Sequence, residues 1–153
     1  MVAGVPRDHV VLVVIGGSVG TLLRYLIATI GGRWVDDIWM IMAINLVGCF
    51  VLGMLLEALA RRGPDAGRRK RLRLLIGTGV CGGFTTYSTL AVDTATLLRT
   101  GSGWTAVLYA VGTLVLGVCA AGAGALAGRR ISPTIAAGAA VRSEPVDAEG
   151  VAR

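Results

Sequence analysis

Charged residues and histidine are scarce in this 153-residue chain. Charged residues make up 16% of the sequence, against about a quarter in a typical soluble domain, and hydrophobic residues make up 54%. His9 is the only histidine, and no serine, cysteine or carboxylate forms a nucleophile–base arrangement with it. The composition therefore argues against a soluble domain, and the lack of such an arrangement argues against an enzyme.

Cysteine is also rare, and its placement excludes two common roles. The three cysteines, Cys49, Cys81 and Cys119, fall in three different apolar stretches, with spacings that match no metal-binding motif. Disulfides between lipid-embedded helices are not expected. We interpret all three as small apolar packing residues.

Long apolar stretches are what the chain has instead. Four of them have the roughly 20 residues that a membrane-spanning helix needs, at residues 10–30, 38–60, 74–98 and 104–128. Polar or helix-breaking residues separate them: GGRWVDD, RRGPDAGRRKRLR and RTGSG. Because Arg24 lies inside the first stretch and only Arg7 precedes it as a basic residue, that stretch is interpreted as a retained helix and not a signal peptide.

The sequence thus predicts an all-α membrane protein with four transmembrane helices. A transmembrane unit would occupy residues 1–130. Residues 131–153 contain two prolines and three acidic residues and lack periodicity, so we expect a disordered cytoplasmic tail there.

Basic residues are distributed unevenly between the two predicted sides of the membrane. Ten Lys or Arg residues lie close to the ends of the spans on one side, namely Arg7, seven residues within 61–73, Arg129 and Arg130, whereas only Arg33 and Arg99 lie on the other side. Trp34, Trp39 and Trp104 all fall at that second side, as interfacial aromatic residues do. The positive-inside rule predicts cytoplasmic termini and accounts for the net charge of +6 without a nucleic-acid partner.

Several polar residues are predicted to lie at membrane depth, where each costs free energy to place. Arg24 either extends its charge towards the interface or draws anions into a vestibule. Asn45 either links two helices or offers its two amide protons to a passing anion. Asp93 needs a partner that the sequence does not identify.

The third apolar stretch holds the most flexible and most hydroxylated part of the chain, residues 77–90, with four glycines and four threonines. Its GTGVCG matches the dinucleotide-binding pattern, but no βαβ unit surrounds it. We instead predict a transmembrane helix broken at its centre by Gly82 and Gly83, since each glycine disfavours helix by about 1 kcal/mol. Unwound carbonyls there can coordinate a cation. Hydroxyls for an ion path come from Thr85, Thr86, Ser88 and Thr89.

Three motifs in this order resemble the Fluc fluoride channels, the CrcB-like family. They are GGSVGTLLRY, INLVGCFVLG and GTGVCGGFTTYST, within about residues 15–128. The resemblance implies a fluoride-specific channel in the bacterial inner membrane that exports fluoride passively. It also implies an antiparallel dimer with two anion pores and a central, structural sodium ion that is not transported.

The resemblance also implies roles for individual residues. The backbone carbonyls of Gly82 and Thr85 would hold the sodium ion, and Arg24 would stand at the anion entrance. Asp93 stands where the family usually has a glutamate. In the family, a row of hydroxyl-bearing residues lies along the last helix, and Tyr109 and Thr113 match its first two positions. Gly117 stands at the third position and has no side chain to donate a hydrogen bond. The expected fluoride pathway comprises Asn45, Tyr87, Ser88, Thr89, Leu90, Tyr109 and Thr113.

Two departures from the family pattern favour a heterodimer over a homodimer. The family typically has TTFSTF, whose two aromatic rings point positive edges at fluoride, whereas this chain has TTYSTL, so Leu90 supplies no ring. The charge bias also opposes insertion in both orientations, which an antiparallel homodimer requires. An oppositely oriented paralogue would explain both features.

Two other functions remain open from the sequence. A subunit that conducts nothing itself and only completes its partner's pore fits Leu90 and Gly117. A small multidrug-type proton-coupled exporter has a similar size, but it needs a carboxylate in the middle of its first helix, and residues 10–30 contain none. The two functions can be distinguished by the resistance that each confers. The exporter would confer resistance to quaternary ammonium compounds, whereas a fluoride channel would confer resistance to fluoride.

Overall fold

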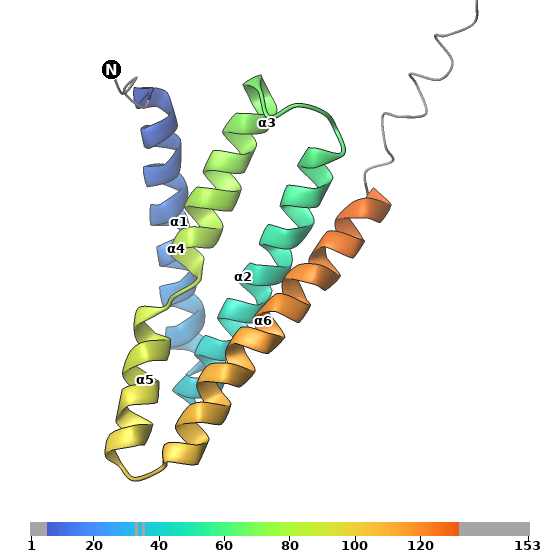
Figure 1. The fold of residues 1–153 in the computed structure, drawn as a ribbon. Coiled ribbons are helices and arrows are strands. Elements are labelled where there is room, and N and C mark those ends of the chain that lie inside the picture. Colours follow the sequence, from blue (N-terminus) through green and yellow to red (C-terminus); the bar gives the residue numbers. More distant parts are fainter. Residues whose placement is uncertain (1–5, 33, 35, 132–153) are drawn as a thin grey trace, which may run out of the picture.

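The computed structural model describes residues 6–32, 34 and 36–131, and every regular element in these residues is helical. This confirms the predicted all-α class. The predicted tail lies outside the described residues except for Ile131. The elements are α1 (Arg7–Gly31), α2 (Asp37–Ala60), α3 (Gly67–Leu72), η1 (Arg73–Cys81), α4 (Gly82–Phe84), α5 (Ser88–Arg99) and α6 (Gly103–Ile131) (Figure 1).

Three of these helices, α1, α2 and α6, are long and apolar enough to cross a membrane. At 1.5 Å per residue, the 24 to 29 residues of each helix exceed the roughly 30 Å of a bilayer's hydrocarbon core. Many of their large apolar side chains are exposed in the single chain, including Val14 and Val118. An apolar outer surface of this extent is what lipid or a second membrane subunit would cover.

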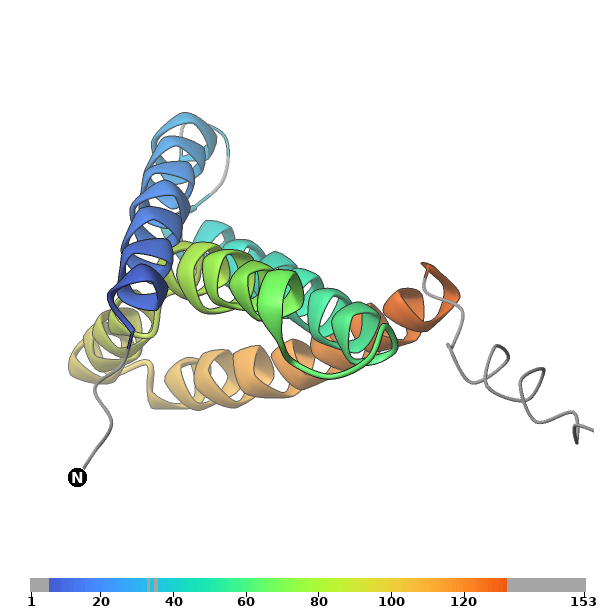
Figure 2. The same ribbon diagram turned by 90° about the horizontal axis from the view of Figure 1, so that it is seen from above.

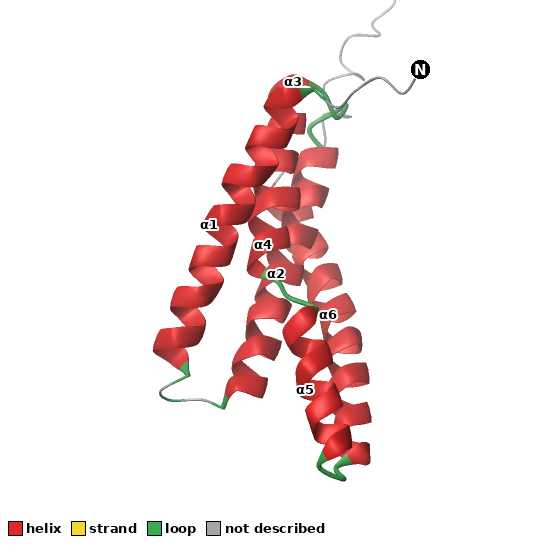
Figure 3. Cartoon of the chain, turned by 90° about the vertical axis from the view of Figure 1, so that its left-hand side faces the viewer, coloured by secondary structure: helices red, strands yellow, loops and turns green. Residues whose placement is uncertain are grey.

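The remaining predicted span is divided into η1, α4 and α5. η1 is a π-helix of nine residues, an uncommon element that is frequently found at functional sites. The chain leaves helical conformation at Thr85, which is extended (φ −79°, ψ 156°), and resumes it at Ser88. Figure 3 shows the resulting short connection between α4 and α5 about halfway along the bundle.

The predicted break is therefore real, but its predicted position was wrong. Gly82 and Gly83 are helical, within α4, and the irregular residues are Thr85, Thr86 and Tyr87. Gly83 is needed for packing, because a Cβ there would overlap the Gly17 carbonyl of α1. Helix propensity at the two glycines did not decide the position, since tertiary contacts outweigh a preference of about 1 kcal/mol.

The broken segment changes its partner at the break. η1 and α4 pack against α1, whereas α5 packs against α6, and α2 pairs along its length with α6. The end-on view in Figure 2 shows α1 and α6 on opposite edges, with η1 and α2 between them. The interface between α1 and the broken segment is very close: a Cβ at Gly16 would overlap the Leu75 carbonyl, and one at Gly20 the Val80 carbonyl. Glycines spaced four residues apart on one helix face, such as Gly16 and Gly20, allow helices to approach this closely.

The basic residues gather at one end of the bundle. The start of α1 and the α3 end of the chain lie together in Figures 1 and 3, and Arg71 reaches Asp8 at 3.9 Å. At the same end, Glu57 forms ion pairs with Arg61 at 2.9 Å and with Arg129 of α6 at 3.0 Å. The fold therefore places the start of α1, residues 61–73 and the end of α6 on one side, as the sequence predicts.

Candidate functional site

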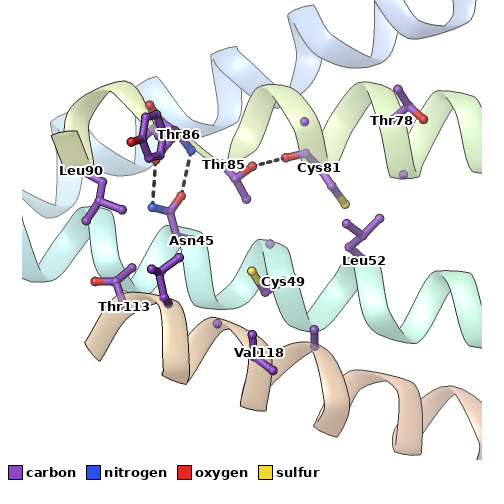
Figure 4. Close-up of a pocket in the computed structure, with 17 residues that line it drawn as sticks. Asn45, Cys49, Leu52, Thr78, Cys81, Thr85, Thr86, Leu90, Thr113 and Val118 are labelled. Atoms are coloured by element: carbon purple, nitrogen blue, oxygen red, sulfur yellow. Dashed lines mark hydrogen bonds between the residues drawn. The ribbon is translucent and has the colours of Figure 1, made fainter. Parts of the chain in front are cut away.

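A groove runs along the broken segment on the side away from α1. It has a volume of about 540 Å³, and its walls are formed by α2, by η1, α4 and the break, and by α6. Figure 4 shows Asn45 and Thr86 near one end, beside Leu90 and Thr113, with Cys49 and Cys81 further along. The groove thus brings together residues that are far apart in the sequence.

Asn45 is joined to the break by two hydrogen bonds. Its Nδ2 donates to the Thr86 carbonyl at 3.0 Å, and its Oδ1 accepts from the Thr86 N–H at 2.8 Å (Figure 4). The side-chain amide therefore satisfies both backbone groups of a residue that has left the helix. One of its two amide protons is used in this link, so one remains for another acceptor.

The Asn45 link also frees a carbonyl of α4. In a continuous helix the Thr86 N–H would bond to the Gly82 carbonyl, but here it bonds to Asn45 instead. Thr85 is extended, and Gly82 is exposed, with nothing within 4 Å of an added Cβ. The carbonyls of Gly82 and Thr85 are thus oxygen donors at the C-terminal end of a helix, the type of group that suits a hard cation such as sodium.

Arg24 contacts the same break from the opposite side. Its Nε donates to the Gly83 carbonyl at 3.3 Å, and Thr21 Oγ1 donates to the same oxygen at 3.4 Å. A cation at this position is favourable because the carbonyls at a helix C-terminus carry partial negative charge. Arg24 therefore caps α4, a role that neither interpretation of the sequence included.

The polar residues of α6 connect to α5 and to each other. Tyr109 OH donates to Asp93 Oδ2 at 3.3 Å, and Tyr109 is 8% exposed. Thr113 is 6% exposed and donates its hydroxyl proton to the Tyr109 carbonyl at 2.7 Å. The structure thus identifies Tyr109 as the partner of Asp93 that the sequence did not reveal.

The hydroxyl residues around the break are mostly paired within the chain. Thr85 Oγ1 donates to the Cys81 carbonyl at 2.9 Å, and Thr86 Oγ1 lies 3.0 Å from Ser88 Oγ and 3.5 Å from Thr89 Oγ1. Among the described residues, no side chain forms a capping hydrogen bond at the N-terminus of α5, which begins directly after the break. The N–H groups of such a terminus attract negative charge.

The two residues of the altered TTYSTL motif lie in different surroundings. Leu90 is 8% exposed and lines the groove, whereas Tyr87 is 79% exposed at its edge. The groove lining includes Asn45, Gly82, Thr85, Tyr87, Leu90 and Thr113, but not Arg24, Ser88, Thr89 or Tyr109. Cys49, one helical turn after Asn45, also lines it and was assigned only a packing role; the four-residue spacing from Asn45 was the available signal.

Comparison with known proteins gives a consistent result. Residues 11–125 match the family model described as CrcB-like protein, Camphor Resistance (CrcB). A protein of Leifsonia xyli named fluoride-specific ion channel FluC 2 is 46% identical over 120 residues, which are 78% of this chain and 83% of that protein.

Two further relatives carry similar names. Fluoride-specific ion channel FluC 1 of Cutibacterium acnes is 43% identical over 127 residues, covering 79% of this chain and 89% of the relative. Fluoride-specific ion channel FluC 1 of Rhodococcus jostii is 42% identical over 121 residues, covering 79% and 86%. Together with the three apolar helices, these matches show that the chain is a multi-pass membrane protein of the CrcB-like family, a family of ion channels and not of enzymes.

Proposed function

We propose that this chain is a subunit of a fluoride-specific channel that lowers cytoplasmic fluoride by passive export. The observation that carries the proposal is the Asn45–Thr86 link, which holds a helix break beside a groove and leaves one amide proton unused. Its relatives, named as fluoride-specific channels, supply the identity of the ion.

The groups at the break suit a small anion. The remaining Asn45 proton and the backbone N–H groups at the start of α5 can replace part of the water around fluoride. Most nearby hydroxyl protons already bond within the chain, so binding at any one point is weak enough for release, as conduction requires. Fluoride that enters as HF, driven by an inward proton gradient, would leave as the anion down its electrochemical gradient.

A structural sodium ion fits the carbonyls of Gly82 and Thr85. When bound, it would neutralise the negative end of α4 and hold the break in one conformation. Two oxygens are fewer than a hard cation usually takes, so a second subunit would complete the site. This supports a dimer in which the exposed Gly82 faces a partner.

We further propose four transmembrane passes in the bacterial inner membrane, with the termini and residues 61–73 in the cytoplasm. Ten basic residues against two favour a single orientation. The antiparallel partner would then be an oppositely oriented paralogue and not a second copy. Single-cysteine variants probed from each side would test this; equal populations of both orientations would exclude the fixed-orientation proposal and permit the homodimer.

A non-conducting role within such a heterodimer is the second candidate. Leu90 occupies a buried position on the groove and offers no ring edge, and Gly117 offers no hydroxyl. The groove of this chain would then complete the assembly while fluoride passes through the other pore.

Fluoride efflux from liposomes tests both candidates. The chain is reconstituted alone and with its paralogue, at equal protein, with chloride efflux as the selectivity control. Efflux by the chain alone would show that it self-assembles and conducts with Leu90 in place. Efflux only with the paralogue would establish the heterodimer, and the absence of efflux from every combination would contradict the proposed function.

A further inference from the structure

The end of the bundle that carries α3 is strongly basic. Residues 61–73 hold seven Lys or Arg residues and a single acidic residue, Asp65. Because this segment directly joins two apolar segments, its charges lie where the bundle would leave the bilayer. A fixed orientation in the membrane explains why this segment is basic. It does not explain why two of its arginines, Arg69 and Arg73, line a cavity.

Several of these charges are already used within the protein. Arg73 pairs with Asp65 at 2.7 Å, and Arg69 donates to the carbonyls of Arg62 at 2.6 Å and Pro64 at 2.9 Å. Arg68 and Lys70 differ: neither forms an ion pair within the described residues. They are therefore the charges of this segment that are available to a ligand.

A cavity of about 450 Å³ borders the same segment, and Arg68 and Lys70 are the sequence neighbours of Arg69, which lines it. One side is apolar, formed by Leu56, Leu59 and Ala60 at the end of α2. Asp65, Arg69 and Arg73 contribute the polar side, together with Gly63. The hydrogen bonds of Arg69 use Nε and Nη1, which leaves Nη2 for a further acceptor. A cavity with an apolar wall and excess positive charge suits an amphipathic ligand with an anionic head.

We infer that this cavity, with Arg68 and Lys70, binds the headgroup of an anionic phospholipid. Basic pockets beside membrane helices on the cytoplasmic side are suited to such headgroups, and nearby basic residues strengthen the attraction. The cavity lies at the ends of membrane-spanning helices, and Leu56 on its apolar wall is 41% exposed. Both features favour a lipid over a nucleic acid, which would leave the apolar wall uncovered. The inference does not depend on which ion the protein conducts.

Native mass spectrometry of the full chain in detergent tests this inference. Dioleoylphosphatidylglycerol and dioleoylphosphatidylcholine are titrated separately and their bound fractions are compared. We expect phosphatidylglycerol to bind more tightly than phosphatidylcholine, and the double variant Arg68→Gln/Lys70→Gln to weaken its binding about 30-fold. Both side chains can be changed without breaking an ion pair, so the variant should remain folded, which size-exclusion chromatography checks.

Arg99→Gln is the matched control, since it removes one cation at the opposite end of the bundle and should leave lipid binding unchanged. Equal affinity for the two lipids, or an equal loss in Arg99→Gln and the double variant, would overturn the inference. Sodium phosphate is the third arm. Failure of millimolar phosphate to displace the lipid would support a lipid site, whereas full displacement would indicate a small-anion site and overturn the lipid assignment.

Discussion

The two sides of the segment from Arg73 to Arg99 are built in opposite ways. Towards α1, glycine lies against backbone, and an added Cβ at Gly83 would overlap the Gly17 carbonyl. Towards α2 and α6, the same segment borders a groove of about 540 Å³. Close backbone packing against α1 holds the segment in position, and the groove on the other side leaves room for an ion.

The difference shows how a broken helix can remain ordered at membrane depth. The α1 side supplies Arg24 to the Gly83 carbonyl, and the groove side supplies Asn45 to both backbone groups of Thr86. Backbone that leaves a helix in a membrane must be satisfied by protein or by a water-filled path. The first three changes below each alter one of these two sides, and the fourth tests an ion pair at the basic end of the bundle; they follow in order of decreasing expected effect.

Gly83→Ala should have the largest effect, because it forces α1 and α4 apart along the whole close interface. Overpacking against backbone costs about 3 kcal/mol, which outweighs the gain of about 1 kcal/mol in helix propensity. Thermal unfolding in detergent should show the midpoint lowered by about 4–8 °C, as a net loss of about 2 kcal/mol implies for a chain of this length.

Gly122→Ala on α6 is the matched control. Gly122 is helical and exposed, and no described residue beyond its own helix lies within 4 Å of an added Cβ, so the stability of this variant should be unchanged or slightly higher. Equal destabilisation by the two substitutions would show that the approach of α1 does not determine the stability of this segment.

Asn45→Asp should abolish fluoride flux with a smaller effect on the fold. The carboxylate still accepts from the Thr86 N–H, but it has no proton for the Thr86 carbonyl or for fluoride, and it repels the anion. Loss of a hydrogen bond to a charged partner corresponds to a decrease of about 100-fold in efflux from liposomes. Thr96→Val, on the outside of α5, is the control, and near-normal flux in Asn45→Asp would remove Asn45 from the pore.

Arg24→Lys distinguishes a helix cap from a simple anion attractor. If capping the Gly83 carbonyl is its main role, the shorter reach of lysine should cost about 1–2 kcal/mol of stability although the charge is kept. Thr21→Val, which removes the neutral and longer bond to the same oxygen, should cost less. Full thermal stability in Arg24→Lys, with reduced flux only in Arg24→Gln, would instead assign Arg24 to the anion entrance.

Asp65→Asn should have the smallest effect, and one that depends on pH. The hydrogen bond from Arg73 lowers the pKa of the Asp65 carboxyl below its usual value. The ion pair therefore stabilises the protein above about pH 4 and loses its effect as pH falls through the lowered pKa. Wild type should be slightly more stable than Asp65→Asn at pH 7, with the difference decreasing as the pH falls below the usual range of an aspartate pKa; a constant difference would rule out this pair as the cause.

The sequence by itself determined the features that depend on local composition. Apolar length predicted α1, α2 and α6, because the length of an apolar stretch depends only on residues within one helix. The arrangement of basic residues at one end followed from their positions between apolar stretches. The motifs around Asn45 and residues 77–89 were sufficient for the family.

Only the tertiary structure decided how the broken segment is held. The break lies at Thr85–Tyr87 and not at Gly82–Gly83, because Asn45 on α2 takes the Thr86 backbone groups and α1 packs against Gly83. Arg24 caps α4, and Tyr109 partners Asp93, through contacts between residues that no local pattern connects. Such pairings depend on how helices cross, and a polar residue at membrane depth bonds to whichever group that crossing brings within reach.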